Sequence, residues 1–286
     1  MQKIAAVTMQ YNETYYLPRW VSYYGSEFGR DNLFVIDNDS DADFGTALDG
    51  VSRIRYRRTA FSDMERARFV SHFVASLLEL YDTVVFTDCD EFVCPDARTQ
   101  RSLRAWIEAN DFEHVTCVGM NVVPDLATED AVLGAGPILG QRRRARLISP
   151  MFKPSVVRKP VRWGGGFHHV NRPPNFQGLF LFHMKMADVG QLLARQALTR
   201  TMTWAKLTHG NHQRKSDAAV LGNVLAQGKL PAVPWSDDEV ERLKRAFVEG
   251  VQAHERGGEV GTMYASPMNL SSEAPMTIPE EFFGIF

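Results

Sequence analysis

The stretch VVFTDCDEFV, residues 84–93, places three carboxylates directly after an almost uncharged run of β-branched and aromatic residues. The apolar run is typical of a short strand that is covered on both faces of a sheet. The carboxylates that follow it are Asp88, Asp90 and Glu91. Because like charges at one strand end repel each other, we expect a positive charge to lie among them.

Outward from this stretch, alternating strand-like and helix-like segments predict an α/β fold. Strands are expected at residues 3–9, 32–38, 52–58 and 82–88, and helices at residues 17–29 and 62–81. Apolar residues recur at helical spacing in both helices, and Ser62 with Glu65 three residues later is a helix-start signal. In the order βαββαβ, the loops at the carboxyl ends of the strands gather in one crevice, where ligands of such sheets bind.

The pattern loosens after a helix at SLRAWIEA and a strand at HVTCVGM. Residues 121–176 are rich in Gly, Pro and Arg and predict only one strand, PSVVRK, so we expect a specificity region there. A last apolar strand at residues 178–185 precedes helices near 188–202, 216–227 and 237–254. We expect the tail from residue 257 onward to be loosely packed.

Composition limits the classes of function. The formal net charge of −2, from 32 Lys and Arg against 34 Asp and Glu, gives no global attraction to nucleic acid. The three cysteines include no CxxC pair, so we expect reduced thiols and a cytosolic protein. No segment reaches the about 18 apolar residues of a membrane helix. We therefore expect a cytoplasmic protein, and a peripheral position at the inner membrane face stays open.

The spacing of the carboxylates suggests a metal. Asp88 and Asp90 are two residues apart, so on an extended strand end they point to the same side and can share a divalent cation. Oxygen ligands favour Mg²⁺ or Mn²⁺ over zinc, and such ions usually bridge to substrate phosphates. The alternative is a solvated acidic loop that caps the following helix.

Three segments together resemble the GT-A-fold glycosyltransferases, close to the family 2 type. They are YNETYYLPRWVSYYGSEFG, LFVIDNDSDADF and VVFTDCDEFV, and the last is similar to the Asp-X-Asp motif that holds the metal and the nucleotide-sugar diphosphate. The resemblance covers roughly residues 3–120. It implies a Rossmann-like mixed sheet flanked by helices, with residues 1–235 as the GT-A domain and residues 236–286 as a C-terminal helix and tail. Within the domain, residues 1–120 would be the nucleotide-sugar half and 121–235 the acceptor half.

The resemblance also implies roles for particular residues. Donor contacts would come from the first two strand ends, the preceding helix and a basic loop: Tyr11, Asn12, Glu13, Asp37, Arg66, Asp88 and Lys215. The metal, Mn²⁺ or Mg²⁺, would lie on Asp88, Asp90 and His183. A turn-forming role for Asn12 and a core position for His183 are the alternatives.

The catalytic base is less defined by the resemblance. Asp90 and His168 are the candidate catalytic residues, and of the adjacent His168 and His169 at most one should face the site. Family 2 enzymes usually supply a carboxylate base from an ED pair, and here the only such pair is Glu129 with Asp130. The basic loop THGNHQRKSD, residues 208–217, could close over a diphosphate.

The implied activity is transfer of a sugar from a UDP- or GDP-linked donor to a hydroxyl of a glycan or lipid-linked acceptor. Inversion at the anomeric carbon and a place in cell-surface polysaccharide synthesis follow from family analogy. Three alternatives remain. The first is a nucleotidyltransferase, although AAVTMQYNE has no Gly-rich phosphate loop. The others are a non-catalytic scaffold that keeps the fold and a zinc hydrolase built from His168, His169 and His183.

Overall fold

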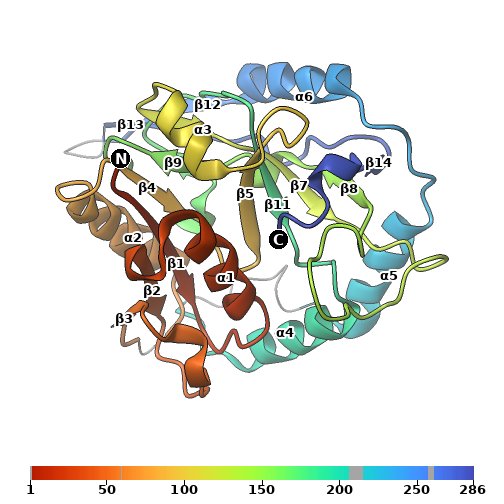
Figure 1. Ribbon diagram of the computed structural model, residues 1–286, viewed down its shortest axis with the longest axis horizontal. Coiled ribbons are helices and arrows are strands. Elements are labelled where there is room, and N and C mark those ends of the chain that lie inside the picture. The colour runs from red at the N-terminus through yellow and green to blue at the C-terminus, as the bar shows by residue number, and fades with distance from the viewer. Residues whose placement is uncertain (1, 59, 206–214, 257–260) are drawn as a thin grey trace.

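The larger of two mixed sheets is built around four parallel strands. The computed structural model describes residues 2–58, 60–205, 215–256 and 261–286. The sheet has the strand order β3-β2-β1-β4-β9-β6 (Figure 1), with β9 antiparallel to β4 and to β6. The strands are β1 (Ile4–Gln10), β2 (Leu33–Asp37), β3 (Ser52–Arg55), β4 (Thr83–Phe86), β6 (His114–Thr116) and β9 (Pro154–Val157).

Both faces of this sheet are covered by helices. Along β1, Ile4 and Ala6 belong to the core that includes α1 (Tyr16–Phe28), whereas Ala5 and Val7 belong to the core that includes α2 (Asp63–Leu77). Since side chains alternate between the faces of a strand, a strand covered on both sides has to be apolar throughout. This explains why β1 and β4 show no alternation in the sequence.

A second, five-stranded sheet has the order β14-β8-β7-β11-β5, and a three-stranded sheet has the order β10-β13-β12. Their strands are β5 (Glu91–Pro95), β7 (Val118–Val122), β8 (Arg144–Leu147), β10 (His169–Val170), β11 (Leu179–His183), β12 (Gln252–Arg256), β13 (Gly261–Ala265) and β14 (Met276–Thr277). The remaining α-helices are α3 (Leu103–Ala109), α4 (Val189–Thr201), α5 (Asp217–Gly228) and α6 (Asp237–Gly250). Two short 3-10 helices, η3 (Ser149–Met151) and η4 (Gly165–Phe167), also border the site described below.

The predicted fold class, an α/β fold with mixed sheets flanked by helices and with helices in the C-terminal part, is confirmed. Several boundaries differ. The predicted strand HVTCVGM is two strands, β6 and β7, which lie in different sheets. The prediction also missed β5, because its first residue is a glutamate that looks like part of an acidic loop.

The prediction of a loosely packed tail is wrong for residues 261–286. The helix expected to reach residue 254 ends at Gly250, and β12 then pairs with β13. Further along, β14 pairs with β8, and Phe282 packs its ring against Phe180 and Phe182. In Figure 1 the C-terminus lies beside β11 and β5, in agreement with the ring contact between Phe286 and Phe92. Few apolar residues in a Pro- and Ser-containing tail are enough when each one fills a core position.

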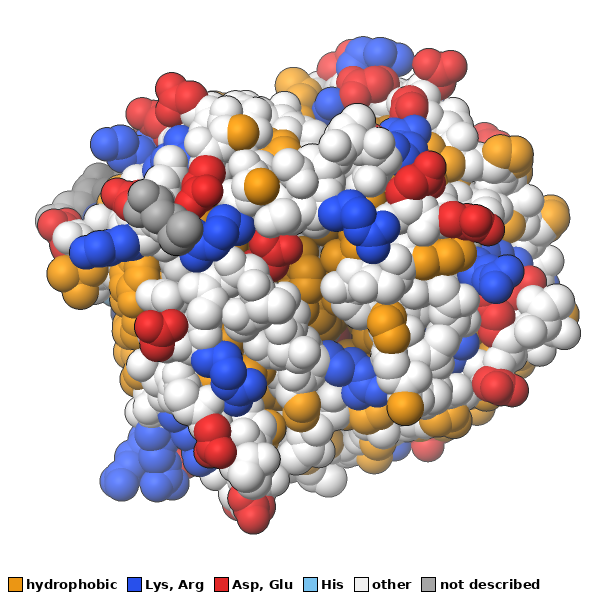
Figure 2. Space-filling view, in the orientation of Figure 1, with side chains coloured by type: hydrophobic (Ala, Val, Ile, Leu, Met, Phe, Trp, Pro, Cys, Tyr) orange, Lys and Arg blue, Asp and Glu red, His pale blue; other side chains and the backbone are white. Residues whose placement is uncertain are grey.

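The surface and the cysteines agree with the composition. On the face drawn in Figure 2, Lys and Arg side chains are interspersed with Asp and Glu side chains. Cys89, Cys94 and Cys117 are free and buried. Within the described ranges, no helix has the length and the apolar composition that crossing a bilayer requires.

We expect Phe282→Ala to lower the free energy of unfolding by about 3–5 kcal/mol, because the ring is fully buried among aromatic neighbours. Urea denaturation measures this change. Met268→Ala is the control, since Met268 is 49% exposed in the same tail and its truncation should change stability by less than about 0.5 kcal/mol. Equal stabilities of the two variants would contradict a packed tail.

Candidate functional site

The two aspartates of the Asp-X-Asp stretch lie in the turn that carries the chain from one sheet to the other. β4 ends at Phe86 and β5 begins at Glu91. The Glu91 N–H donates to the Asp88 carbonyl over 3.0 Å, and the Asp88 N–H donates to Oε2 of Glu91 over 3.2 Å. The Asp90 carbonyl accepts from the N–H of Met184 at the end of β11, over 2.7 Å. Hydrogen bonds on both sides therefore fix this turn.

A buried ion pair supports the turn. Glu91 and Lys153 are 2% and 6% exposed, and the Lys153 ammonium donates to Oε1 of Glu91 and lies 3.7 Å from Oδ2 of Asp88. Burial alone would lower the pKa of Lys153, but the negative charges of Glu91 and Asp88 hold it above its ordinary value, so the group is a cation. Arg66 Nη2 lies 3.5 Å from Oδ1 of Asp88. Part of the positive charge expected among the carboxylates is thus supplied by the protein.

Asp90 faces a different partner, His183, which ends β11 directly opposite Glu91 in register. Oδ2 of Asp90 is 3.3 Å from Nε2 of His183, and Nδ1 of His183 is 2.7 Å from Oδ1 of Asn121. When Nδ1–H donates to the Asn121 amide oxygen, the Nε2 lone pair points at the carboxylate. Two lone pairs that face each other at this distance attract a proton or a metal ion.

Charge around Asp90 favours its ionised form. Burial would raise the pKa of this carboxyl, but when Nε2 of His183 carries a proton, the charge and the hydrogen bond of the imidazolium, with the charges of Lys185 and Arg195, bring the pKa below its ordinary range. The carboxylate is therefore available as a ligand at neutral pH. Asp88 differs, because two basic side chains already lie beside it.

These residues line a pocket of about 170 Å³ at the carboxyl ends of the parallel strands, which we name the strand-end pocket. One wall is α4, which contributes Leu192, Arg195 and Gln196. The pocket gathers six of the residues singled out from the sequence: Tyr11, Glu13, Arg66, Asp88, Asp90 and His183. Glu13 also caps α1, since its Oε1 accepts from the backbone N–H of Tyr16 over 3.0 Å, and burial raises its pKa.

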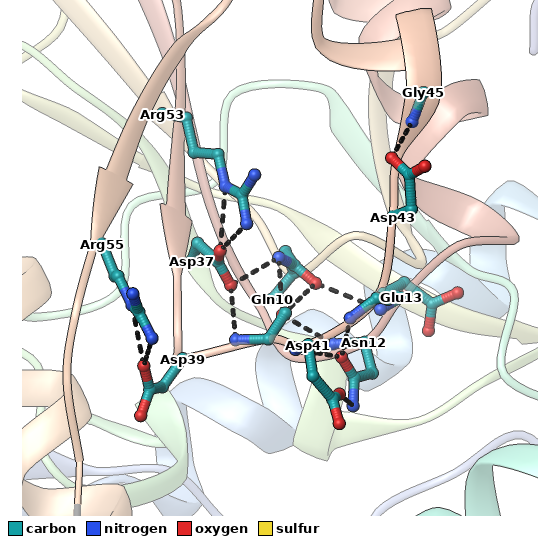
Figure 3. A network of polar contacts seen from close by, with 12 residues as sticks. Gln10, Asn12, Glu13, Asp37, Asp39, Asp41, Asp43, Gly45, Arg53 and Arg55 are labelled. Atoms are coloured by element: carbon teal, nitrogen blue, oxygen red, sulfur yellow. Dashed lines mark hydrogen bonds and ion pairs between the residues drawn. The ribbon is translucent and has the colours of Figure 1, made fainter.

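Asp37 and Asn12, two other predicted donor contacts, are engaged within the protein (Figure 3). The buried Asp37 carboxylate accepts from Nε2 of Gln10 over 3.0 Å and from Nε of Arg53 over 2.8 Å. Asn12 has a positive φ of 50°, and its side-chain oxygen accepts from the backbone N–H of Ala42 over 3.0 Å. Neither residue lines the strand-end pocket. Asn12 joins the loop after β1 to the loop after β2, and Asp37 joins the end of β2 to β1 and β3.

Lys185 and Arg195 line the pocket and were not identified from the sequence. Arg195 donates to the Tyr11 carbonyl over 2.6 Å, which ties α4 to the loop after β1. Burial lowers the pKa of Lys185, against the charge of Asp90. Among the described residues, Lys185 has neither a hydrogen bond nor an ion pair with another side chain, so its amino group is not engaged by them. A sequence signal existed, because Lys185 follows His183 by two positions at a strand end.

A second pocket, of about 410 Å³, is lined in part by the same residues, and we name it the η4 lobe. It shares four lining residues with the strand-end pocket: Arg66, Asp88, His183 and Lys185. Its other walls come from the start of α2, from η3 and from η4. His168 lines this lobe and His169 does not.

Other predicted residues lie elsewhere. Lys215 is exposed before α5 and lines neither pocket. Glu129 of the ED pair accepts from the N–H of Asp125 and of Arg143, over 2.9 and 3.1 Å, and braces a loop away from both pockets. His209, His212 and Arg214 of the basic loop lie outside the described residues.

The site fits a divalent cation that the protein holds with few ligands. In the portion of the chain that the structure describes, no group of three or more His, Cys, Asp or Glu side chains could hold a metal ion. Asp90 and His183 form a two-ligand set of carboxylate oxygen and imidazole nitrogen, which suits Mn²⁺. Mg²⁺ and similar ions usually keep several waters and take further ligands from substrate phosphates. The donor set therefore fits a metal that arrives with a phosphate-bearing substrate.

Comparison with known proteins gives no family. No protein-family model and no curated protein matches the chain. Among solved structures it is similar to mannose-1-phosphate geranyltransferase from Thermus thermophilus, with 16% identity, a TM-score of 0.29, and coverage of 78% of this chain and 67% of that one. A likeness of this size does not identify an activity, which has to be argued from the site.

We expect Lys153→Met to cost about 3–5 kcal/mol of unfolding free energy, because it leaves Glu91 buried without its cation. Urea denaturation at neutral pH measures this cost, and adding Glu91→Gln to the same chain should recover much of it. The control is Lys244→Met, which removes an ion pair at 2.7 Å with the half-exposed Glu241 and should cost less than about 1 kcal/mol. Equal costs for the two lysines would contradict a supporting role for the buried pair.

Proposed function

We propose that the protein is a metal-dependent glycosyltransferase that moves a sugar from a nucleoside-diphosphate sugar to an acceptor hydroxyl. One observation carries the proposal: a carboxylate oxygen of Asp90 and Nε2 of His183 face each other at 3.3 Å, at the carboxyl ends of parallel strands. Lys185, which has no ion-pair partner among the described residues, lies in the same pocket. A carboxylate and an imidazole beside a lysine suit a metal-bound diphosphate.

The proposal implies the following roles for residues in and around the pocket. When bound, Mn²⁺ or Mg²⁺ offsets negative charge on the departing diphosphate, and Asp90 with His183 would hold it. Asn121 orients His183 through Nδ1. Arg66 and Lys153 hold Asp88 beside the metal position without ligating the ion themselves. Lys185 would contact a phosphate oxygen, and the Tyr11 ring, under the Arg58 guanidinium at 4.1 Å, would border the nucleotide.

Two assays separate this function from nucleotidyl transfer. The first offers UDP- and GDP-sugars with Mn²⁺ and measures release of the nucleoside diphosphate. The second offers nucleoside triphosphates with sugar 1-phosphates and measures release of pyrophosphate. Activity in the first assay alone supports the proposal, and activity in the second alone establishes a nucleotidyltransferase. If the protein shows no metal-dependent nucleotide binding, the remaining function is that of a non-catalytic scaffold.

We expect Asp90→Ala to abolish metal-dependent turnover of nucleotide sugars while the fold is kept, because the ion loses its carboxylate. His183→Ala should raise the Mn²⁺ concentration for half-maximal activity by roughly tenfold or more. Activity is measured across a Mn²⁺ titration, and His72→Ala, an exposed histidine of α2, is the control. Full activity of the wild-type protein in excess EDTA would refute the requirement for a metal ion.

We expect Lys185→Met to weaken Mn²⁺-dependent binding of UDP and GDP by roughly tenfold or more, because a charge-assisted contact to phosphate is lost. Calorimetric titration measures the affinity. Lys215→Met tests the lysine that the resemblance implies, and its exposed position predicts little change. If Lys215→Met weakened nucleotide binding more than Lys185→Met, the phosphate contact would be assigned to Lys215.

A further inference from the structure

The η4 lobe adjoins the strand-end pocket. The two spaces meet at the shared residues Arg66, Asp88, His183 and Lys185. A donor diphosphate held by the metal would place the scissile sugar bond near this junction, where the lobe offers room for a second substrate. The lobe's volume of about 410 Å³ lies within the about 300–1,000 Å³ of small-molecule sites.

The surface of the lobe beyond the junction suits an uncharged ligand. Beyond the shared residues, Lys153 is paired with Glu91, and Asp63 is paired at 3.2 Å with the shared Arg66. The remaining walls include the thioethers of Met64 and Met151 and the backbone of η4. At Gly165 an added Cβ would lie 3.1 Å from the Met64 sulfur, so the glycine lets η4 approach α2 closely. Apolar walls with exposed backbone groups fit the faces and hydroxyls of a neutral sugar.

Asp63 stands where such a hydroxyl would react. It is the first residue of α2, after the capping Ser62, and it lines the lobe but not the strand-end pocket. The Arg66 guanidinium forms ion pairs with two carboxylates. Its Nη1 is 3.2 Å from Oδ1 of Asp63, and its Nη2 is 3.5 Å from Oδ1 of Asp88. Asp63 is thereby held next to the junction. Its Oδ2 has no hydrogen bond to any described residue and can accept one from a ligand.

We propose that the η4 lobe binds the acceptor as a neutral, hydroxyl-bearing sugar unit and that Asp63 is the catalytic base. This rests on the proposed glycosyl transfer with inversion. The acceptor oxygen forms a bond to the anomeric carbon as the bond from that carbon to the diphosphate oxygen breaks. The electron pair of the broken bond leaves with the nucleoside diphosphate, and the acceptor hydroxyl proton passes to Oδ2 of Asp63. The base is thus supplied by the helix before the Asp-X-Asp turn.

Asp63→Asn tests the base. We expect it to lower kcat for transfer to neutral monosaccharide acceptors by about 100-fold or more, the scale of general-base catalysis, with Mn²⁺-dependent affinity for UDP and GDP unchanged within about twofold. Asp217→Asn is a matched control, because Asp217 also follows a capping serine at the start of a helix and pairs with an arginine, Arg200, at 2.7 Å. His168→Gln tests the other proton acceptor of the lobe.

Met151→Trp tests the lobe independently of Asp63. We expect the added ring to raise the acceptor KM at least tenfold and to leave nucleotide affinity unchanged, whereas Met268→Trp, at an exposed position in the tail, should change neither. Thermal unfolding checks that each variant is folded. If Asp63→Asn does not fold, Asp63→Ser takes its place in the test of the base, and Met151→Trp decides only on the lobe.

The outcomes separate two failures. If the wild-type protein shows no Mn²⁺-dependent binding of UDP or GDP and no turnover of nucleotide sugars, the proposed function fails. If the wild type is active but Asp63→Asn behaves like Asp217→Asn, or His168→Gln alone loses the chemical step, the assignment of the base is overturned. An active Met151→Trp variant with an unchanged acceptor KM overturns the assignment of the lobe as the acceptor site.

Discussion

The buried ion pair between Glu91 and Lys153 is the interaction on which the site depends. The chain has to leave one sheet at Phe86 and enter another at Glu91, and the turn between them carries two aspartates. A glutamate buried without a partner would strongly destabilise this crossing. Lys153 directly precedes β9, which pairs with β4, so the ion pair joins the neighbouring strands of both sheets. The positions of Asp88 and Asp90 follow from this join.

The same ion pair makes Asp88 and Asp90 differ in how far the protein already offsets their charges. Asp88 lies within 4 Å of both Arg66 and Lys153, so its charge is largely offset by the protein. Asp90 faces an imidazole whose other nitrogen is occupied by Asn121. On the proposed assignment, a metal ion would meet one carboxylate and one imidazole nitrogen rather than a general acidic patch. The order of the residues along the turn determines which of them is free for a ligand.

Local sequence signals predicted the first half of the fold and much of the pocket. Uninterrupted apolar runs identified β1 and β4, and the polar residue at the end of another apolar strand identified His183, which does face Asp90. Partners that are distant in the chain were not predictable. Lys153 is separated from Glu91 by 62 positions, and Phe282 belongs to a core assembled from strands far upstream. Burial of such residues depends on tertiary neighbours that periodicity does not encode.

Charge also divides the two halves of the site between two kinds of substrate. On the proposed assignment, an anionic diphosphate is drawn to Arg195 in the strand-end pocket and to Lys185 at the junction, because Arg66 and Lys153 already have carboxylate partners of their own. A neutral acceptor gains nothing from those cations and loses little in a lobe whose charges beyond the junction are paired. Arg66 belongs to both sides and holds a carboxylate of each, Asp88 and Asp63. A single guanidinium thus connects the Asp-X-Asp turn to the proposed base.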